Sequence, residues 1–532
     1  MSTTRWGDAV TRGVIHGHSS LVYEEHPDSV GAVLIQSRRW GQRPFIFHGD
    51  RVVTFADHEQ IVRRVAARLR CEAIGRGDRV GIYAANSPEW VATFFGILEA
   101  GAIAVPCNGW WSAEEMEHAC EVAQPSVIIA DDKRSSRVPH SIRRIGFAAL
   151  TEPDDTDEHS KADAVLHPEQ HSEDDPAVIL FTAGTTNFPK GATLSHRALI
   201  ANLQSLLIVA NKLPHQIPDD IRASVALVGL PLFHIGAIQL IMVPLMTGSQ
   251  IVFLEGRFDG GEVLSLVEGR GVTMFSGVPT MMERLLAHPD LATRDVTSLR
   301  TVVLGGAPVD DGLLSRIAAA FPSTSRGVGQ TYGLTEAGGV VSTGVGGELR
   351  KHAGSSGRLA PVVEVQIRHA DEDGNGEIFV RSPAAMDGYW GLIGDTTIDA
   401  EGWIRTGDIG HVDEERYLYI TGRSKDMIIR GGENIAPARI EAVLREHPAV
   451  AEVTVIGLAH DDLGELVAAV VRLSRGAHVS GEELAAFAAH RLAHFEMPAR
   501  WIFRDDALPT NDSGKILKSA LRTEYASEAV IR

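Results

Sequence analysis

Up to about residue 400, the sequence alternates short runs rich in β-branched residues with longer segments of helical periodicity. This rhythm constrains the fold most, because strand–helix–strand repeats build parallel sheets with helices on their faces. The predicted strands cover residues 79–84, 126–130, 177–182, 224–229 and 301–304. We therefore expect an α/β fold whose large N-terminal domain consists of helix-covered β-sheets.

The C-terminal part is predicted to be a separate, small α+β domain. Pro437 can begin a helix, and Ser480 with Glu483 forms a capping box ahead of another. Further strands are predicted at 452–458, 466–473 and 500–504. We place the boundary so that residues 1–423 form the N-terminal domain and residues 424–532 the C-terminal domain.

Charge and composition exclude several classes of protein. The formal net charge of −19 opposes nonspecific attraction to nucleic acid or anionic membranes. The three cysteines, Cys71, Cys107 and Cys120, are too few and too scattered for a disulfide framework or a zinc site. The apolar run 235–246 is shorter than the roughly 20 residues that span a bilayer. We expect a soluble cytoplasmic protein without nucleic-acid partners or integral membrane association.

One loop carries the composition of a phosphate site. Residues 181–191 read FTAGTTNFPKG and follow a predicted buried strand, with a helix expected near Ser195. Backbone amides and hydroxyls of such a loop can bind phosphate oxygens while Lys190 offsets their charge. A plain turn with a solvated lysine is the alternative interpretation. The loop is not a Walker motif, because Lys190 stands between proline and glycine.

This loop resembles the phosphate-binding signature of the adenylate-forming superfamily, which includes acyl-CoA synthetases, peptide-synthetase adenylation domains and beetle luciferases. Further segments resemble that family's motifs and follow in its order. They are GQTYGLTE at 329–336, GWIRTGD at 402–408, GRSKDMI at 422–428 and LPTNDSGK at 508–515. The segment RGGENIAP at 430–437 resembles acyl-CoA synthetases in particular.

The resemblance implies an ATP-dependent acyl-CoA ligase that uses ATP, Mg²⁺ and coenzyme A. Such an enzyme joins a small-molecule carboxylic acid to AMP, releases pyrophosphate and passes the acyl group to coenzyme A. Loading of a carrier protein or an amine, luciferase-type oxidation, and nucleotide binding without chemistry stay open as alternatives. The oligomeric state is left open, a homodimer included.

The resemblance also implies which residues carry the chemistry. Lys515 would stabilise the charge gathered between the carboxylate and the α-phosphate. Glu336 would hold Mg²⁺, for which one protein carboxylate completed by water and phosphate oxygens is typical. Lys190 and Thr182 would act on the phosphates. Taken alone, each has an ordinary interpretation, such as a solvated lysine or a surface acid.

A larger set would surround the nucleotide. Asp408 would accept both ribose hydroxyls and Arg423 would contact ribose or phosphate, with an Asx turn and an interdomain ion pair as the respective alternatives. The loop departs from the family pattern at Ala183, which lacks the usual hydroxyl, and at Asn187, where glycine is usual. The implied nucleotide-binding residues are Thr182, Ala183, Gly184, Thr185, Thr186, Lys190, Gly305, Gly306, Ala307, Gln330, Thr331, Tyr332, Gly333, Thr335, Asp408, Arg423 and Lys515.

The remaining implied sites concern the acyl group, the thiol and domain movement. The acyl pocket would be lined by His234, Gly236, Ala237, Gly305 and Gly333. Small residues there suggest a roomy apolar pocket for a medium, long-chain or polycyclic acid. The coenzyme A tunnel would pass Gly431, Gly432, Glu433 and Asn434. Lys425 would be the hinge about which a mobile C-terminal domain rotates.

Overall fold

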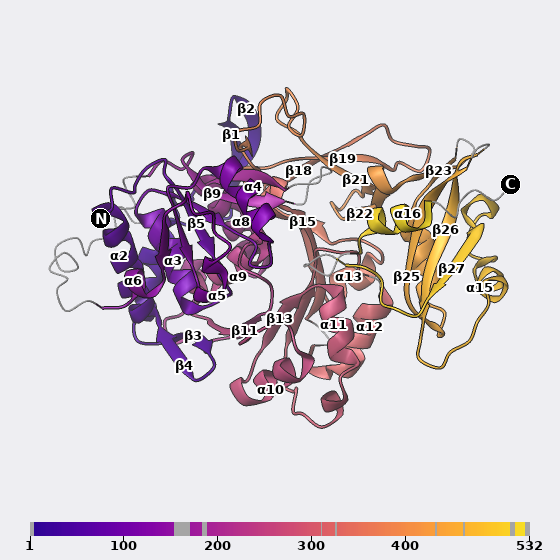
Figure 1. Ribbon diagram of the computed structural model, residues 1–532, viewed down its shortest axis with the longest axis horizontal. Helices are drawn as coiled ribbons and strands as arrows, with labels where there is room; N and C mark the ends of the chain where they lie inside the picture. The colour runs from indigo at the N-terminus through magenta and orange to yellow at the C-terminus, as the bar shows by residue number, and fades with distance from the viewer. Residues whose placement is uncertain are drawn as a thin grey trace.

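The computed structural model describes residues 5–153, 171–182, 189–309, 311–324, 327–430, 433–460, 463–510 and 516–526. Figure 1 shows a large N-terminal body and a smaller C-terminal unit at the other end of the long axis. The acidic stretch at residues 152–175 lies largely outside the described residues.

A seven-stranded sheet forms one half of the large body. From edge to edge its strands are β20 (Gly388–Tyr389), β10 (Lys190–Ser195), β9 (Pro176–Thr182), β6 (Ile103–Pro106), β5 (Arg79–Tyr83), β7 (Val127–Ala130) and β8 (Arg144–Gly146). Strands β9, β6, β5, β7 and β8 run parallel, whereas β10 pairs antiparallel with both β9 and β20.

A nine-stranded sheet forms the other half. Its order is β17 (Arg358–Leu359), β16 (Gly339–Val345), β15 (Val328–Leu334), β14 (Thr301–Leu304), β13 (Met274–Gly277), β11 (Val225–Val228), β12 (Gln250–Phe253), β3 (Pro44–His48) and β4 (Arg51–Thr54). The strands from β15 to β3 are parallel, and the outer strands at both edges are antiparallel.

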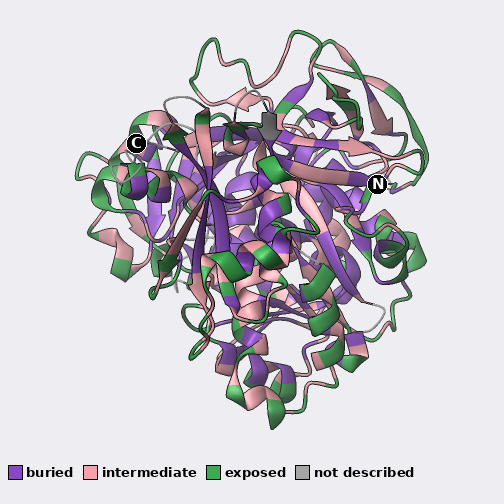
Figure 2. Cartoon of the chain, turned by 90° about the vertical axis from the view of Figure 1, so that its right-hand side faces the viewer, coloured by how far each residue is buried: buried purple, intermediate pink, exposed green. Residues whose placement is uncertain are grey.

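The two sheets share one hydrophobic core. It contains apolar residues of both sheets together with those of helices α1 (Gly31–Ser37), α2 (Phe55–Cys71), α3 (Pro88–Glu99), α8 (His196–Val209) and α9 (Ile235–Thr247). Helix α4 (Ala113–Ala123) covers the outer face of the seven-stranded sheet. Helices α10 (Gly260–Arg270), α11 (Pro279–Leu286) and α12 (Asp311–Ala320) cover the outer face of the other. Figure 2 shows buried strands inside and exposed segments on the outer helices and loops.

Local sequence signals explain where these elements begin. The Ser87 hydroxyl accepts a hydrogen bond from the Trp90 amide at the start of α3, where Pro88 takes the first position. Ser195 caps α8 in the same way through the Ala198 amide. All of the strands expected in this domain are present, with ends that differ by at most one residue.

The prediction was incomplete after the phosphate loop. The expected helix does begin after Ser195, but strand β10 lies between loop and helix. Strands β9 and β10 form an antiparallel pair in which Thr182 stands opposite Lys190. The loop motif includes Lys190 and Gly191, the first two residues of β10, so the short strand was not recognised. As a result, both ends of the loop are fixed by one strand pair.

A four-stranded antiparallel sheet follows the two large sheets. Its order is β18 (Glu364–Arg368), β19 (Gly376–Arg381), β21 (Ile404–Val412) and β22 (Leu418–Arg423). It packs on the end of β16 through a common apolar cluster that includes Val341, Ile378 and Leu418. In Figure 1 this sheet lies between the large body and the C-terminal unit.

The C-terminal unit is an α+β domain, as expected. Its five-stranded sheet contains β24 (Glu433–Ile435), β23 (Ile428–Arg430), β26 (Gly464–Leu473), β25 (Val450–His460) and β27 (Arg500–Arg504). Helices α14 (Pro437–Arg445) and α15 (Gly481–Ala488) pack on one face and α16 (Lys518–Ala526) on the other. The capping box of Ser480 and Glu483 is present. No helix in the described part of the chain is long and apolar enough to cross a bilayer.

Candidate functional site

Asp408 lies at the centre of one group of polar residues. Its carboxylate accepts a hydrogen bond from the Tyr332 hydroxyl at 2.6 Å and pairs with the Arg423 guanidinium at 3.0 Å. Burial and the neighbouring Asp408 carboxylate raise the pKa of Tyr332 well above its ordinary value, so the phenol stays a donor. The Thr406 hydroxyl accepts from the Asp408 amide at 3.1 Å and fixes the backbone. Asp408 is therefore a buried, oriented carboxylate and not the Asx turn of the alternative interpretation.

The Asp408–Arg423 pair lies within one sheet. The two residues stand opposite each other in the register of β21 and β22. Arg423 is thus part of an ion pair, as one alternative proposed, but the pair does not cross between domains. The Arg423 side chain is 40% exposed, so this ion pair borders the solvent.

Glu336 lies in a short 3₁₀ turn, Thr335–Ala337, directly after β15. Its carboxylate accepts a hydrogen bond from the Tyr389 hydroxyl at 2.8 Å. Burial and the adjacent Glu336 charge raise the pKa of Tyr389, so this phenol also stays protonated. Because Tyr389 belongs to β20, the contact joins the nine-stranded sheet to the seven-stranded sheet.

Lys190 completes this second group from the first position of β10. Its ammonium lies 3.0 Å from the Asp395 carboxylate and 4.8 Å from the centre of the Tyr389 ring. The backbone fixes these partners, since the Trp390 amide donates to the Gly191 carbonyl at 2.7 Å and the Met386 amide to the Glu336 carbonyl at 2.9 Å. Segment 386–390 therefore links the strand that begins with the phosphate-loop lysine to the turn that carries the expected magnesium ligand.

The motif after β14 packs tightly against β15. A Cβ on Gly305 would come within 2.9 Å of the Thr331 carbonyl oxygen, so only glycine fits there. Gly306 has φ +77, a left-handed conformation that also favours glycine. The Gln330 amide donates to the Ser355 carbonyl and the Thr331 hydroxyl to the Ser342 carbonyl. These contacts align the start of the motif that carries Tyr332 and Glu336.

His234 precedes α9 and has a buried Nε2 atom without a hydrogen-bond partner among the described residues. Burial lowers the pKa of His234 to about 4, so the imidazole is neutral at pH 7. Asn86 holds the preceding backbone by donating to the Leu230 carbonyl at 2.8 Å and accepting from the Leu232 amide at 2.9 Å. A fixed neutral ring with one unsatisfied nitrogen is suited to a polar ligand group.

The surroundings of His234 are aromatic and partly open. Its ring lies 4.4 Å from that of Phe233, which contacts Trp110 edge-on at 5.6 Å. Gly236 is exposed, and a Cβ on it would meet nothing within 4 Å. Ala237, in contrast, is fully buried in the core. Open space therefore adjoins Gly236 and not Ala237.

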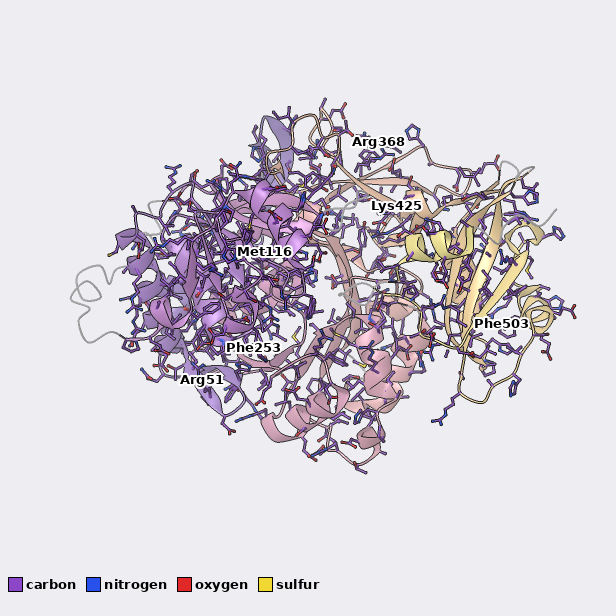
Figure 3. All side chains as sticks on the ribbon, in the orientation of Figure 1. Arg51, Met116, Phe253, Arg368, Lys425 and Phe503 are labelled. Atoms are coloured by element: carbon purple, nitrogen blue, oxygen red, sulfur yellow. The ribbon has the colours of Figure 1, made fainter. Side chains whose placement is uncertain are left out.

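The segment around Lys425 is anchored on both sides. Arg423 is held by Asp408 in the four-stranded sheet, whereas Asp426 pairs at 3.2 Å with Arg522 of α16. Between them Ser424 and Lys425 are exposed (Figure 3 labels Lys425). Each neighbour is thus tied to a different unit, and the predicted hinge residue lies between these two contacts.

Several expected site residues lie outside the described residues. These are Ala183, Gly184, Thr185, Thr186, Asn187, Gly431, Gly432 and Lys515. Glu433 and Asn434 are described only by their backbone, in β24, which pairs with β23 so that Arg430 stands opposite Glu433. The predictions for these positions stay predictions.

Sequence reasoning missed Tyr389 and Asp395. Both lie between two recognised motifs, and only the Gly388-Tyr389 pair offers a weak signal of a short strand. Their importance depends on pairing of β20 with β10, which joins residues about 200 positions apart.

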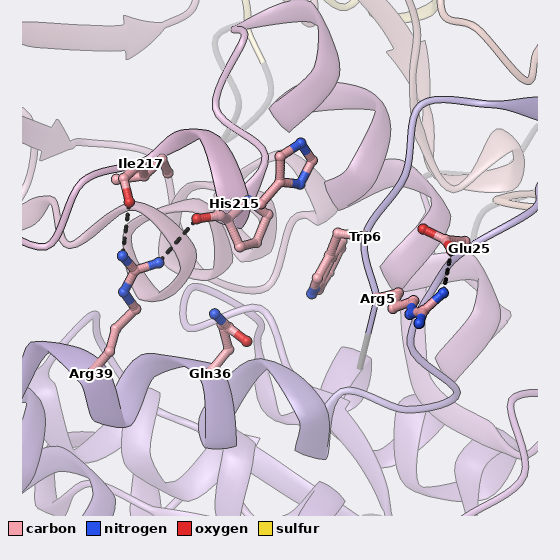
Figure 4. Close-up of a pocket in the computed structure, with 8 residues that line it drawn as sticks. Arg5, Trp6, Glu25, Gln36, Arg39, His215 and Ile217 are labelled. Carbon is pink, nitrogen blue, oxygen red and sulfur yellow. Dashed lines mark hydrogen bonds and ion pairs between the residues drawn. The ribbon is translucent and has the colours of Figure 1, made fainter. Parts of the chain in front are cut away.

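A surface cavity of about 460 Å³, lined by residues including Trp6, Gln36 and Arg39, contains none of the expected site residues (Figure 4).

The geometry fits a magnesium nucleotide. Asp408 offers two oxygens on a fixed backbone for a diol, and Glu336 offers one carboxylate for a hard cation. Lys190 offers a cation at the end of the loop between β9 and β10. The helix-covered sheets, the α+β C-terminal domain and this site together define the class of adenylate-forming enzymes.

The comparisons with known proteins agree with this class. The AMP-binding enzyme family matches residues 34–390, and the AMP-binding enzyme C-terminal domain matches residues 439–515. The chain therefore belongs to the AMP-binding enzyme family, and the resemblance inferred from its motifs is confirmed.

Relatives differ in acid and acceptor. A feruloyl-CoA synthase from Amycolatopsis is 35% identical, with 90% of this chain and 95% of the relative covered. A fatty acid–[acyl-carrier-protein] ligase from Streptomyces coeruleorubidus is 32% identical, with 91% and 93% covered. The solved structure of o-succinylbenzoate coenzyme A synthetase from Bacillus subtilis, in complex with ATP and magnesium ion, has a TM-score of 0.76 at 29% identity, with 92% and 99% covered.

Proposed function

We propose that this protein is an ATP-dependent acyl-CoA ligase that activates an apolar carboxylic acid. The acid would be a medium, long-chain or polycyclic one. The first half-reaction forms acyl-AMP and releases pyrophosphate, and the second transfers the acyl group to coenzyme A. The observation that carries the proposal is that one motif contacts both polar groups: Tyr332 donates to Asp408, and Glu336 accepts from Tyr389, whose ring lies against the Lys190 ammonium.

Each residue has a physical task in the first half-reaction. Asp408 accepts the ribose hydroxyls, with Tyr332 and Arg423 holding its orientation. Glu336 holds Mg²⁺, which neutralises phosphate charge when bound. Lys190 and Thr182, paired across β9 and β10, bind the phosphates. Lys515 stabilises the charge between carboxylate and α-phosphate, where two anions must meet.

The character of the acid follows from the surroundings of His234. A neutral imidazole can donate one hydrogen bond to a carboxylate, and its pKa of about 4 keeps it uncharged at working pH. The aromatic rings of Phe233 and Trp110 and the open space at Gly236 favour an apolar acyl group over acetate. A relative named feruloyl-CoA synthase supports an aromatic acid as one member of this range.

The second half-reaction requires rotation of the C-terminal domain. We propose residues 1–423 and 424–532 as the two domains and Lys425 as the hinge. The ion pairs of Arg423 and Asp426, each to a different unit, support this assignment. Rotation would withdraw Lys515 and bring the hairpin of β23 and β24 to the acyl adenylate. In the sequence, Gly431 and Gly432 separate those strands, and glycine has no side chain that would obstruct a thiol arm.

A panel of carboxylic acids tests the proposal. Pyrophosphate release is measured for each acid with and without coenzyme A, and acyl-CoA is quantified at the same time. We expect release with apolar acids, little with acetate, and acyl-CoA formed in proportion. A protein that binds ATP but shows no acid-dependent pyrophosphate exchange would be a nucleotide-binding protein without chemistry, and the proposal would fall.

A carrier protein is the specific alternative to coenzyme A as the acyl acceptor. The fatty acid–[acyl-carrier-protein] ligase among the relatives supports a carrier protein, whose pantetheine arm presents the same thiol as coenzyme A. An enzyme of that kind would form acyl-AMP normally and release little acyl-CoA. Adding a holo carrier protein to the same assay distinguishes the two acceptors by the acylated product.

A further inference from the structure

Lys190 is held by an anion of the protein itself. The Asp395 carboxylate lies 3.0 Å from the ammonium, and the two side chains are 18% and 28% exposed, respectively. The backbone also holds the Asp395 side chain, because its other oxygen accepts a hydrogen bond from the Thr397 amide at 2.8 Å. Burial opposes its ionisation, but the Thr397 hydrogen bonds and the Lys190 ammonium lower the pKa of Asp395. A full negative charge therefore stands beside the lysine of the phosphate loop at neutral pH.

A second carboxylate is linked to Lys190 through Tyr389. Lys190 also lies over the Tyr389 ring, and the Tyr389 hydroxyl is bonded to Glu336. One carboxylate thus contacts the ammonium directly, and a second is connected to it through the tyrosine. Any polyphosphate that reaches Lys190 must displace Asp395 or tolerate a neighbouring like charge, and either adds an electrostatic cost.

We propose that Asp395 is a positioning residue that competes with the β- and γ-phosphates for Lys190, weakening ATP binding and promoting pyrophosphate release. This inference rests on the proposed function. Before ATP binds, Asp395 holds the ammonium in place and neutralises it. After the acid has been adenylated, Asp395 pairs with the Lys190 ammonium again. Pyrophosphate then no longer has this cation as a partner. AMP lacks the outer phosphates, and its binding is independent of Asp395.

The test is Asp395→Asn, which removes the charge but keeps an oxygen for the Thr397 amide. Dissociation constants for ATP, pyrophosphate and AMP are measured by calorimetry on the full chain. We expect ATP and pyrophosphate to bind about fivefold more tightly, the scale of one partly exposed ion pair, with AMP unchanged. Inhibition of acid-dependent turnover by added pyrophosphate should become stronger by the same factor.

The matched control is Asp399→Asn. Asp399 lies in the same loop and accepts backbone hydrogen bonds from Glu401 and Trp403, but it pairs with Arg368 instead of Lys190. Binding of all three ligands should be unchanged in this variant. Asp395→Ser, which also keeps an acceptor for the Thr397 amide, replaces Asp395→Asn if that variant does not fold.

The outcomes separate the two proposals. Asp395→Asn with unchanged or weaker ATP binding, or with an equal change for AMP, would overturn the role of Asp395. A gain that persists in a Lys190→Gln background would overturn competition for the ammonium. Wild-type protein that binds no ATP would instead remove the proposed function. Tighter ATP and pyrophosphate binding, confined to proteins that keep Lys190, supports the inference.

Discussion

The Tyr332 hydroxyl donates a hydrogen bond of 2.6 Å to the Asp408 carboxylate, across the boundary between the nine-stranded and the four-stranded sheet. Arg423 approaches the same carboxylate from β22. Two donors thus fix an acid that is only 4% exposed. The expected ribose contact is therefore organised before the nucleotide arrives, which lowers the entropy lost on binding.

Tyr332→Phe should weaken binding of both ATP and AMP. It removes one hydrogen bond to a charged acceptor, and an effect of about tenfold corresponds to roughly 1.4 kcal/mol. Dissociation constants of the two nucleotides, measured side by side, check this. Tyr389→Phe is the matched control, since its hydroxyl contacts Glu336 and AMP binding should be unaffected. Equal losses in both variants would contradict the assignment of Asp408 to the ribose.

Glu336→Gln should raise the magnesium requirement of acid-dependent pyrophosphate exchange. The amide still accepts the hydrogen bond from Tyr389 but carries no charge for a hard cation. A magnesium titration at fixed ATP should show half-saturation at about a tenfold higher concentration, as expected for the loss of roughly 1.4 kcal/mol. An unchanged titration would place the ligand on another residue.

Lys425→Pro should slow thioester formation more than adenylation. Proline fixes φ and would oppose rotation between the anchors formed by Arg423 and Asp426. Pyrophosphate exchange reports the first half-reaction, and conversion of synthetic acyl-AMP with coenzyme A reports the second. Lys425→Ala, which keeps backbone freedom, should leave both close to wild type. Equal slowing of both steps by proline would remove the hinge assignment.

Much of the fold could be predicted from sequence because its signals are local. The Ser87 cap, Pro88 at the first turn and the capping box of Ser480 and Glu483 each specify a helix start within a few residues. Buried parallel strands such as Thr301–Leu304 read as short apolar runs between helices. Strand β10 was missed because its residues overlap a motif that suggested only a loop.

The candidate site could be predicted only where a motif carries it. Asp408, Glu336 and Lys190 stand in recognisable segments, but their partners Tyr389 and Asp395 do not. Tyr389 reaches Lys190 and Glu336 only because β20 adds to the edge of the seven-stranded sheet. Such long-range pairing depends on the packing of the whole domain and leaves no pattern within a short stretch of sequence.

Lys515→Ala should abolish acid-dependent pyrophosphate exchange while leaving thioester formation from synthetic acyl-AMP intact. The lysine is expected to act only where two anions approach each other in the first half-reaction. Both half-reactions are measured on the same preparation, with circular dichroism as the control for folding. Loss of both activities in a folded protein would contradict the assignment of Lys515 to one conformation.

His58 should make stability depend on pH in the mildly acidic range. It is 1% exposed, lies against the rings of Phe45 and Phe95, and neither ring nitrogen has a hydrogen-bond partner among the described residues. Burial lowers the pKa of His58 to about 3, whereas an unfolded histidine titrates near 6.5. Between these values the unfolded chain binds a proton that the folded chain excludes. Stability is therefore lost as pH falls below about 6.5.

His58→Leu should reduce this loss. From pH 7 to pH 5 one such histidine costs about 2 kcal/mol of unfolding free energy by linkage, and the variant should lose correspondingly less than wild type over that interval. Urea unfolding at pH 7 and pH 5 measures the change in unfolding free energy between the two pH values. A packing effect of the substitution that is equal at both pH values cancels in this change. The exposed His490 provides the control, since His490→Leu should keep the wild-type pH dependence. If His58→Leu also keeps the wild-type pH dependence, the acid sensitivity arises from other buried groups. His196 would then be tested in the same way, because burial lowers its pKa to about 3 as well.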